Sequence, residues 1–201
     1  MIKRPVRLPP HAPGMRIGLF GGSFNPPHEG HLLVSRIALK RLRLDRLWWL
    51  VSPGNPLKDT RHLPPLATRI AAARALARDP RIVVTGVEAE IGARYSVDTL
   101  RFLRHRCRGV HFVWIMGADN LLQFHRWRRW AEIARLAPIA VIDRPGATLR
   151  VASAKAAQRF ASARRREYEA PAFARAQPPA IIALHGPRSA RSSTQLREGG
   201  K

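Results

Sequence analysis

The chain has 201 residues, which is enough for one α/β domain with a substantial core and short for two. Its 45% hydrophobic and 24% charged residues are typical of a globular protein, and no apolar run approaches the length of a membrane span. Because Cys107 is the single cysteine, an intrachain disulfide and a cysteine-based zinc site are excluded, and a cytoplasmic location is expected. Residues 1–14 are basic and proline-rich without the apolar centre of a secretory signal, so we expect a flexible extension before a domain of residues 15–201.

The charge balance is strongly basic, with 36 Lys and Arg against 13 Asp and Glu and a net charge of +23. Such a field attracts anions, including nucleotides and nucleic acids. The arginines occur in nearly every segment, however, and residues 164–166 are the only run of three. A nucleic-acid-binding protein more often concentrates its charge in one patch with interleaved aromatic residues. A non-catalytic protein that binds nucleic acid is therefore kept as the weaker alternative from a different functional class.

Hydrophobic patterning predicts strands that alternate with helices. The expected strands cover residues 15–19, 47–51, 82–84, 110–116, 139–142 and 181–184. The expected helices cover residues 32–44, 66–78, 96–106, a short stretch around 121, 127–137, one segment between 150 and 180, and a terminal turn after 192–194. This alternation predicts a single Rossmann-like α/β domain, with a parallel sheet of about five to six strands flanked by helices. Ligands of such folds bind at the carboxyl ends of the strands.

The most informative stretch follows the first expected strand and reads GGSFNPPHEGH over residues 21–31. Two glycines ahead of a helix N-terminus let backbone N–H groups approach an anion, and His28 and His31 share one helix face. A metal site at this pair would need further ligands, and no close His, Asp or Glu cluster supplies them. The glycine spacing is neither that of a Walker A loop nor that of a dinucleotide fingerprint. The stretch therefore favours phosphate binding, in which imidazole N–H groups donate to phosphate oxygens.

Residues 22–31 resemble the G-S-F-[DN]-P-x-H-x-G-H signature of the HxGH-motif nucleotidyltransferases. Further segments are similar to those of bacterial nicotinate-nucleotide adenylyltransferases, in the same order: WWLVSPGNPLK at 48–58, YSVDTL at 95–100, IMGADNLL and FHRW within 115–127, and SSTQLR at 192–197. The resemblance spans residues 15–197.

This resemblance implies transfer of AMP from ATP to nicotinate mononucleotide, which gives nicotinate adenine dinucleotide and pyrophosphate in NAD biosynthesis. The mononucleotide phosphate attacks the α-phosphate of ATP in line, so positioning and charge neutralisation carry the catalysis. Mg²⁺ accompanies ATP and is held mainly by its phosphates, with no metal ligands from the protein. A phosphopantetheine adenylyltransferase and a nicotinamide-nucleotide adenylyltransferase are the closest alternatives. The expected partners are the two nucleotides and no membrane, and the sequence leaves the oligomeric state open.

Roles for individual residues follow from the same resemblance. His28 and His31 are expected to be catalytic, because they would contact the phosphates and stabilise the transition state. A larger set is expected to bind ATP and its phosphates: Gly21, Gly22, Ser23, Phe24, Lys58, Gly117, Asp119, Ser192, Ser193, Thr194 and Arg197. Trp127 is expected to stack on the pyridine ring of the mononucleotide, and the backbone around Ser96 and Arg128 to bind its carboxylate.

Purely structural roles compete with several of these assignments. Helix N-capping alone would explain Asp119 and residues 192–194, and Ser96 is itself a candidate N-cap. Lys58 is compatible with a solvated loop lysine. A tryptophan on a helix is more often a core residue, although Trp130 is the better candidate for that role than Trp127.

Overall fold

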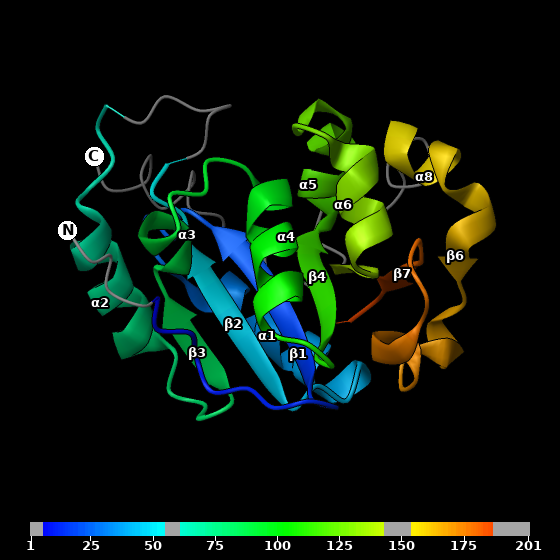
Figure 1. The fold of residues 1–201 in the computed structure, drawn as a ribbon, viewed down its shortest axis with the longest axis horizontal. Helices are drawn as coiled ribbons and strands as arrows, with labels where there is room; N and C mark the ends of the chain where they lie inside the picture. Colours follow the sequence, from blue (N-terminus) through cyan, green and yellow to red (C-terminus); the bar gives the residue numbers. More distant parts are fainter. Residues whose placement is uncertain (1–5, 55–60, 143–153, 187–201) are drawn as a thin grey trace.

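The structure is a computed structural model in which residues 6–54, 61–142 and 154–186 are described (Figure 1). Seven strands form one sheet in the order β3-β2-β1-β4-β5-β7-β6, and each pair of neighbours is parallel. The strands are β1 (Arg16–Gly22), β2 (Arg46–Val51), β3 (Ile82–Thr85), β4 (His111–Gly117), β5 (Ile139–Ile142), β6 (Arg164–Arg165) and β7 (Ile181–Leu184). The predicted Rossmann-like α/β fold is confirmed.

The helices that connect these strands are α1 (Glu29–Arg41), α2 (Leu66–Leu76), α3 (Val87–Glu90), α4 (Ser96–Arg106), α5 (Ala118–Gln123), α6 (Trp130–Leu136) and α8 (Lys155–Arg159). Four short 3₁₀ turns are η1 (Phe124–Arg126), η2 (Ala161–Ala163), η3 (Glu167–Glu169) and η4 (Phe173–Arg175). None of the helices within the described ranges is both long and apolar enough to cross a membrane.

The predicted elements differ from the observed ones mainly at their ends. The helix expected at 32–44 begins at Glu29, because His28 caps it. The helix expected at 127–137 begins at Trp130, after a 3₁₀ turn. The predicted strand count of five to six was low, because β6 consists of two exposed arginines that carry no strand pattern. The terminal turn expected after residues 192–194 lies outside the described residues.

The order of the strands places a switch point at the centre of the sheet. From β1 the chain moves outward through β2 to β3, then returns to pair β4 with the other side of β1. Successive connections on the two sides of β1 therefore depart in opposite directions, which opens a crevice beyond the carboxyl ends of β1 and β4. In open α/β sheets this crevice is where ligands bind.

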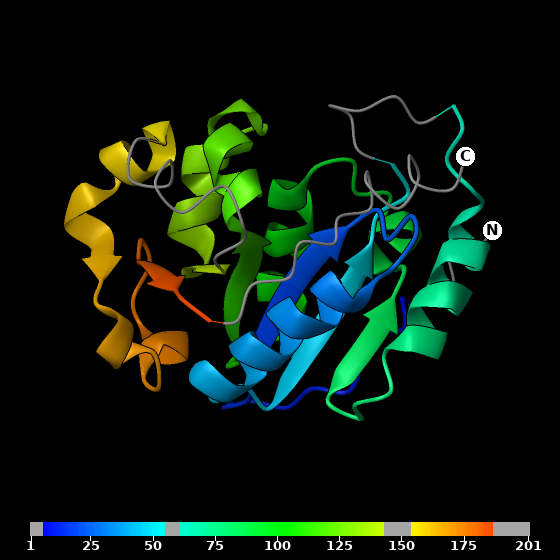
Figure 2. The same cartoon turned by 180° about the vertical axis from the view of Figure 1, so that it is seen from behind.

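Helices cover both faces of the sheet. Figure 1 shows α4 and α6 in front of it, and Figure 2, from behind, shows α1 on the opposite face. The strands alternate between two cores, so that Trp48 packs with residues of α4 while its neighbour Trp49 packs with residues of α1. Val6 and Leu8, from the expected N-terminal extension, pack against the α4-side core.

A buried serine links α1 to β2 directly behind the first turn of α1. The hydroxyl of Ser35 donates to the carbonyl of His31 at 2.7 Å, and it accepts the indole N–H of Trp49 at 2.8 Å. Ser35 and Trp49 are both fully buried, so neither group has water as an alternative partner.

We predict that Ser35→Ala lowers the free energy of unfolding by about 1–3 kcal/mol, because it leaves the buried Trp49 indole without an acceptor. The same substitution made in a Trp49→Phe background should cost less, since no indole N–H is then stranded. Urea unfolding of the four proteins measures the difference. An equal cost in both backgrounds would show that the hydrogen bond does not stabilise the fold.

Candidate active site

The turn that links β1 to α1 is organised by its two histidines. The backbone N–H of His28 donates to Nδ1 of His31, and the N–H of Gly30 donates to Nδ1 of His28, each at 3.1 Å. His28 thus caps α1 with its side chain while His31, three residues on, caps His28 in return. Both histidines are buried, with 5% and 8% of their surface exposed.

These hydrogen bonds fix which nitrogen of each ring carries a proton. An Nδ1 that accepts an N–H bond has no proton of its own, so the neutral ring is protonated at Nε2. The ring centroids of His28 and His31 are 3.9 Å apart, at the N-terminal end of a thirteen-residue helix. Two Nε2–H donors and a helix dipole of positive sign thus lie together beyond β1, an arrangement that favours an anion.

Phe24 is held in an uncommon backbone conformation within the same turn. Its φ of 47° lies in the left-handed region, which costs a non-glycine residue free energy. Its ring stacks on Trp49 at 4.9 Å between centroids and lies 4.7 Å from the ring of His31. The side chain of Phe24 is therefore an anchor for the turn, and the expected contact with phosphate can come only from its backbone.

The second strand of the crevice, β4, ends in Gly117 and runs directly into α5. Gly117 is the N-cap of α5 and Asp119 lies in its first turn, so the competing prediction that Asp119 is the N-cap is wrong. The structure therefore places Gly117 at the end of β4 and Asp119 just beyond it, next to the strand that carries the His28–His31 turn.

The residues expected to bind the mononucleotide come from α4 and from the segment before α6. Ser96 is the first residue of α4 rather than its N-cap, because Tyr95 takes the N-cap position. The guanidinium carbon of Arg128 lies 5.1 Å from the centre of the Tyr95 ring, which brings Arg128 beside the start of α4. Trp127 packs edge-on against Phe124 and Trp114, at 5.4 and 6.2 Å between centroids, so it is partly a core residue.

Five of the expected ATP-binding residues cannot be placed. They are Lys58, Ser192, Ser193, Thr194 and Arg197, and all lie outside the described residues. Within the described ranges, no group of three His, Cys, Asp or Glu side chains is arranged to hold a metal ion.

Comparison of the sequence with known proteins identifies a family. The profile of the cytidylyltransferase-like family matches residues 19–199. A probable nicotinate-nucleotide adenylyltransferase of Methylorubrum extorquens (strain PA1) is 67% identical to this chain, in an alignment that covers 91% of this chain and 99% of that protein. Another, of Brucella abortus (strain 2308), is 57% identical, in an alignment that covers 92% of this chain and 95% of that protein. The chain belongs to the cytidylyltransferase-like family, among the nicotinate-nucleotide adenylyltransferases.

The resemblance that the motifs indicated is thereby confirmed, and the chain is a nucleotidyltransferase. A solved structure, Plasmodium falciparum nicotinic acid mononucleotide adenylyltransferase complexed with NaAD, has the same fold, with a TM-score of 0.68 at 14% identity. That alignment covers 94% of this chain and 83% of the Plasmodium chain.

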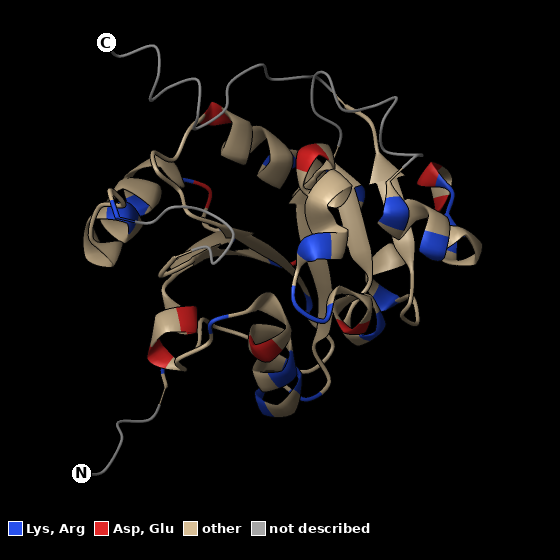
Figure 3. Cartoon of the chain, turned by 90° about the horizontal axis from the view of Figure 1, so that it is seen from above, with Lys and Arg blue, Asp and Glu red and all other residues tan. Residues whose placement is uncertain are grey.

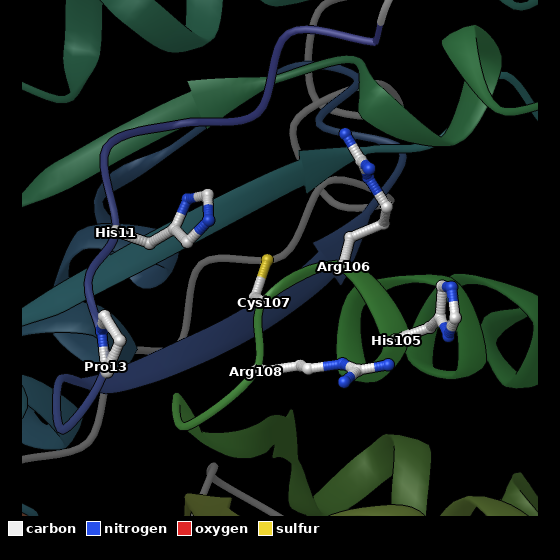
Figure 4. A pocket seen from close by; sticks show the side chains of 6 residues that line it. All are labelled: His11, Pro13, His105, Arg106, Cys107 and Arg108. Carbon is white, nitrogen blue, oxygen red and sulfur yellow. The ribbon is translucent and has the colours of Figure 1, made fainter.

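A hollow at the opposite edge of the sheet does not share the features of this candidate site. It has a volume of about 500 Å³ and is lined by His11, Pro13 and residues 105–108 at the end of α4. Figure 4 shows the side chains of His105, Arg106 and Arg108 extending away from His11 and Cys107. Its basic groups do not converge on one point, and it faces the amino ends of the strands, so we assign it no ligand.

Sequence patterning did not identify two buried charged residues, Arg69 and Glu88, near the candidate site. Arg69 in α2 lies in an Ala-rich helix, and Glu88 in α3 lies two residues from a second glutamate, so neither carries a distinguishing signal. Glu88 accepts a hydrogen bond at 3.0 Å from the hydroxyl of Thr99, in the first turn of α4. Burial raises the pKa of Glu88 to about 7, and the hydrogen bond from Thr99 opposes that rise in part.

Glu88 should therefore make the stability of the fold depend on pH. Because the pKa of Glu88 is higher in the folded state than its ordinary value of 4.5, the folded chain binds this proton more tightly than the unfolded chain does. Its contribution to the free energy of unfolding is complete below pH 4.5 and is lost as the pH rises through about 7. We predict that Glu88→Gln, which stays neutral, is more stable than the parent at pH 8 by about 1–3 kcal/mol.

Chemical unfolding at pH 5, 6, 7 and 8 measures this effect. Glu90→Gln is the matched control, since Glu90 is exposed on the same helix. In the Glu90→Gln control, the free energy of unfolding should decline between pH 5 and 8 as it does in the parent. In Glu88→Gln, this decline should be smaller. Parallel pH profiles for Glu88→Gln and the parent would contradict the prediction.

Proposed function

We propose that this chain transfers AMP from ATP to nicotinate mononucleotide and releases pyrophosphate. The observation that carries the proposal is identity of 67% to a probable nicotinate-nucleotide adenylyltransferase, along nearly its whole length. The geometry supports the same reaction, because an anion-binding turn and a second strand end meet at the switch point of the sheet. The proposal includes a cytoplasmic location.

The two histidines act on the phosphates that react. In the proposed mechanism, Nε2–H of His28 and of His31 donates to phosphate oxygens and stabilises the charge that accumulates at the α-phosphorus. The backbone N–H groups of residues 21–24 cradle the phosphates, and Gly117 with Asp119 binds the ribose of ATP. No side chain forms a covalent bond, so the rate comes from positioning and from charge neutralisation.

The remaining roles complete the two substrate sites. Trp127 stacks on the pyridine ring, and the backbone around Ser96 and Arg128 binds the carboxylate. Lys58, Ser192, Ser193, Thr194 and Arg197 bind the β- and γ-phosphates of ATP, as the resemblance implies. The substrate is the magnesium complex of ATP, whose phosphate oxygens are the ligands that Mg²⁺ prefers.

Two other functions make different predictions. A nicotinamide-nucleotide or phosphopantetheine adenylyltransferase would use the same turn with another acceptor. A nucleic-acid-binding protein would bind through its charge alone, yet Figure 3 shows Lys and Arg distributed around the molecule rather than gathered on one element.

Pyrophosphate release in the presence of ATP and Mg²⁺ separates these functions. We expect turnover with nicotinate mononucleotide, less with nicotinamide mononucleotide, and none with phosphopantetheine. Absence of pyrophosphate with both mononucleotides would exclude the proposed reaction. Salt-sensitive binding of RNA or DNA without pyrophosphate release would instead support the nucleic-acid alternative.

Trp127→Ala should raise KM for nicotinate mononucleotide about tenfold and change KM for ATP little, because a stacked ring contributes about 1–3 kcal/mol. Trp127→Phe is the control, since it keeps an aromatic face against Phe124. Steady-state kinetics well below the unfolding temperature measures both constants. A rise in KM for ATP alone would remove Trp127 from the pyridine site.

A further inference from the structure

Arg69 is a buried cation in the first turn of α2, with 3% of its surface exposed. Burial lowers the pKa of its guanidinium, because loss of water disfavours the charged form. An arginine nevertheless remains charged near neutral pH, so the charge must be stabilised by its surroundings. All of its hydrogen-bond partners among the described residues are backbone carbonyls.

These carbonyls come from three separate segments of the chain. Nη1 of Arg69 donates to the carbonyl of Ser23 and to that of Ser52, both at 2.8 Å. Nε donates to Pro64 at 2.9 Å, and Nη2 donates to Pro53 at 3.4 Å. One planar side chain therefore ties the turn after β1, the loop after β2 and the start of α2 together. A lysine ammonium cannot reproduce these directions, because all its donors are on one atom.

The contact with Ser23 determines how the next peptide group is oriented. The Ser23–Phe24 peptide is trans, so its carbonyl and its N–H point in opposite directions. Because the carbonyl of Ser23 points at Arg69, the N–H of Phe24 points away from Arg69. No residue within the described ranges accepts a hydrogen bond from that N–H.

The other side of this peptide is fixed by the ring of Phe24. That ring is stacked on Trp49 and lies against His31, which holds the residue at its positive φ. A strained conformation persists only when its surroundings determine it from several directions. Arg69 and the aromatic stack together supply those directions.

We propose that Arg69 is a positioning residue that aims the Phe24 N–H at a phosphate of the bound nucleotide. This inference rests on the proposed function, in that it assumes ATP binds beyond β1. It adds a residue that touches no substrate and acts entirely through the peptide group between Ser23 and Phe24.

The Phe24 amide can be observed directly in the unaltered protein. Protein labelled with ¹⁵N at its seven phenylalanines gives few amide signals, and a Phe24→Leu variant identifies the one from Phe24. We expect this signal to move when MgATP is added and to move little with adenosine, which has no phosphate. A Phe24 signal that MgATP leaves in place would overturn the proposal.

Substitution of Arg69 tests the cause of that orientation. Arg69→Lys keeps the positive charge but loses the planar guanidinium, whose several N–H groups donate in fixed directions. We therefore expect the Kd of MgATP to rise about tenfold or more, while the Kd of adenosine stays within about twofold. Arg16→Lys is the matched control, since Arg16 pairs with Asp45 at the amino end of β1, the end of the strand that lies away from Ser23 and Phe24. It should leave both constants unchanged.

Calorimetric titration gives both constants without any mononucleotide, so the result is independent of which acceptor the enzyme uses. Equal losses of MgATP and adenosine binding in Arg69→Lys, or no loss of either, would overturn the proposal. Normal binding of MgATP and a Phe24 response, combined with no turnover, would count against the proposed function alone. If Arg69→Lys does not fold, a Phe24 signal that MgATP leaves in place in the unaltered protein still overturns the proposal.

Discussion

The common direction of β2, β1 and β4 is the constraint on which the site depends. Because these strands are parallel and adjacent, the chain leaves each of them at the same edge of the sheet. The return of the chain from β3 to β4 then puts two strand ends beside one another. Segments almost a hundred residues apart, at Gly22 and Gly117, thereby become neighbours.

The turn after β1 uses the same two imidazole rings for folding and for its proposed chemistry, through different nitrogen atoms. Nδ1 of His28 and Nδ1 of His31 satisfy backbone N–H groups that the start of a helix would otherwise leave unpaired. The same hydrogen bonds fix each proton on Nε2, the nitrogen that the proposed mechanism uses. Behind the turn, Ser35 and Trp49 hold the first turn of α1 against β2. Stability and reactivity at this turn are therefore coupled.

The sequence predicted the fold class and most strands because buried parallel strands leave continuous apolar runs, as at residues 139–142 and 181–184. It also identified the turn of His28 and His31, since this signature is local. It could not identify Arg69, because the carbonyls that hold it are up to 46 residues away. Glu88 was missed for a similar reason: its burial depends on how α3 packs on α4. Helix caps were predicted poorly, because Tyr95 lacks the short polar side chain of the preferred capping residues and Gly117 has no side chain to cap with.

The catalytic role of His31 is tested most directly by comparing kcat for His31→Asn and His31→Gln. An asparagine can still accept the His28 N–H through Oδ1 but has no donor where Nε2 lies, whereas a glutamine can present an N–H near that position. We expect His31→Asn to lose about 10²- to 10³-fold in kcat with little change in the Kd of ATP, and His31→Gln to lose less. A folded His31→Asn variant that keeps the parent's kcat would contradict the proposal that this imidazole stabilises the transition state.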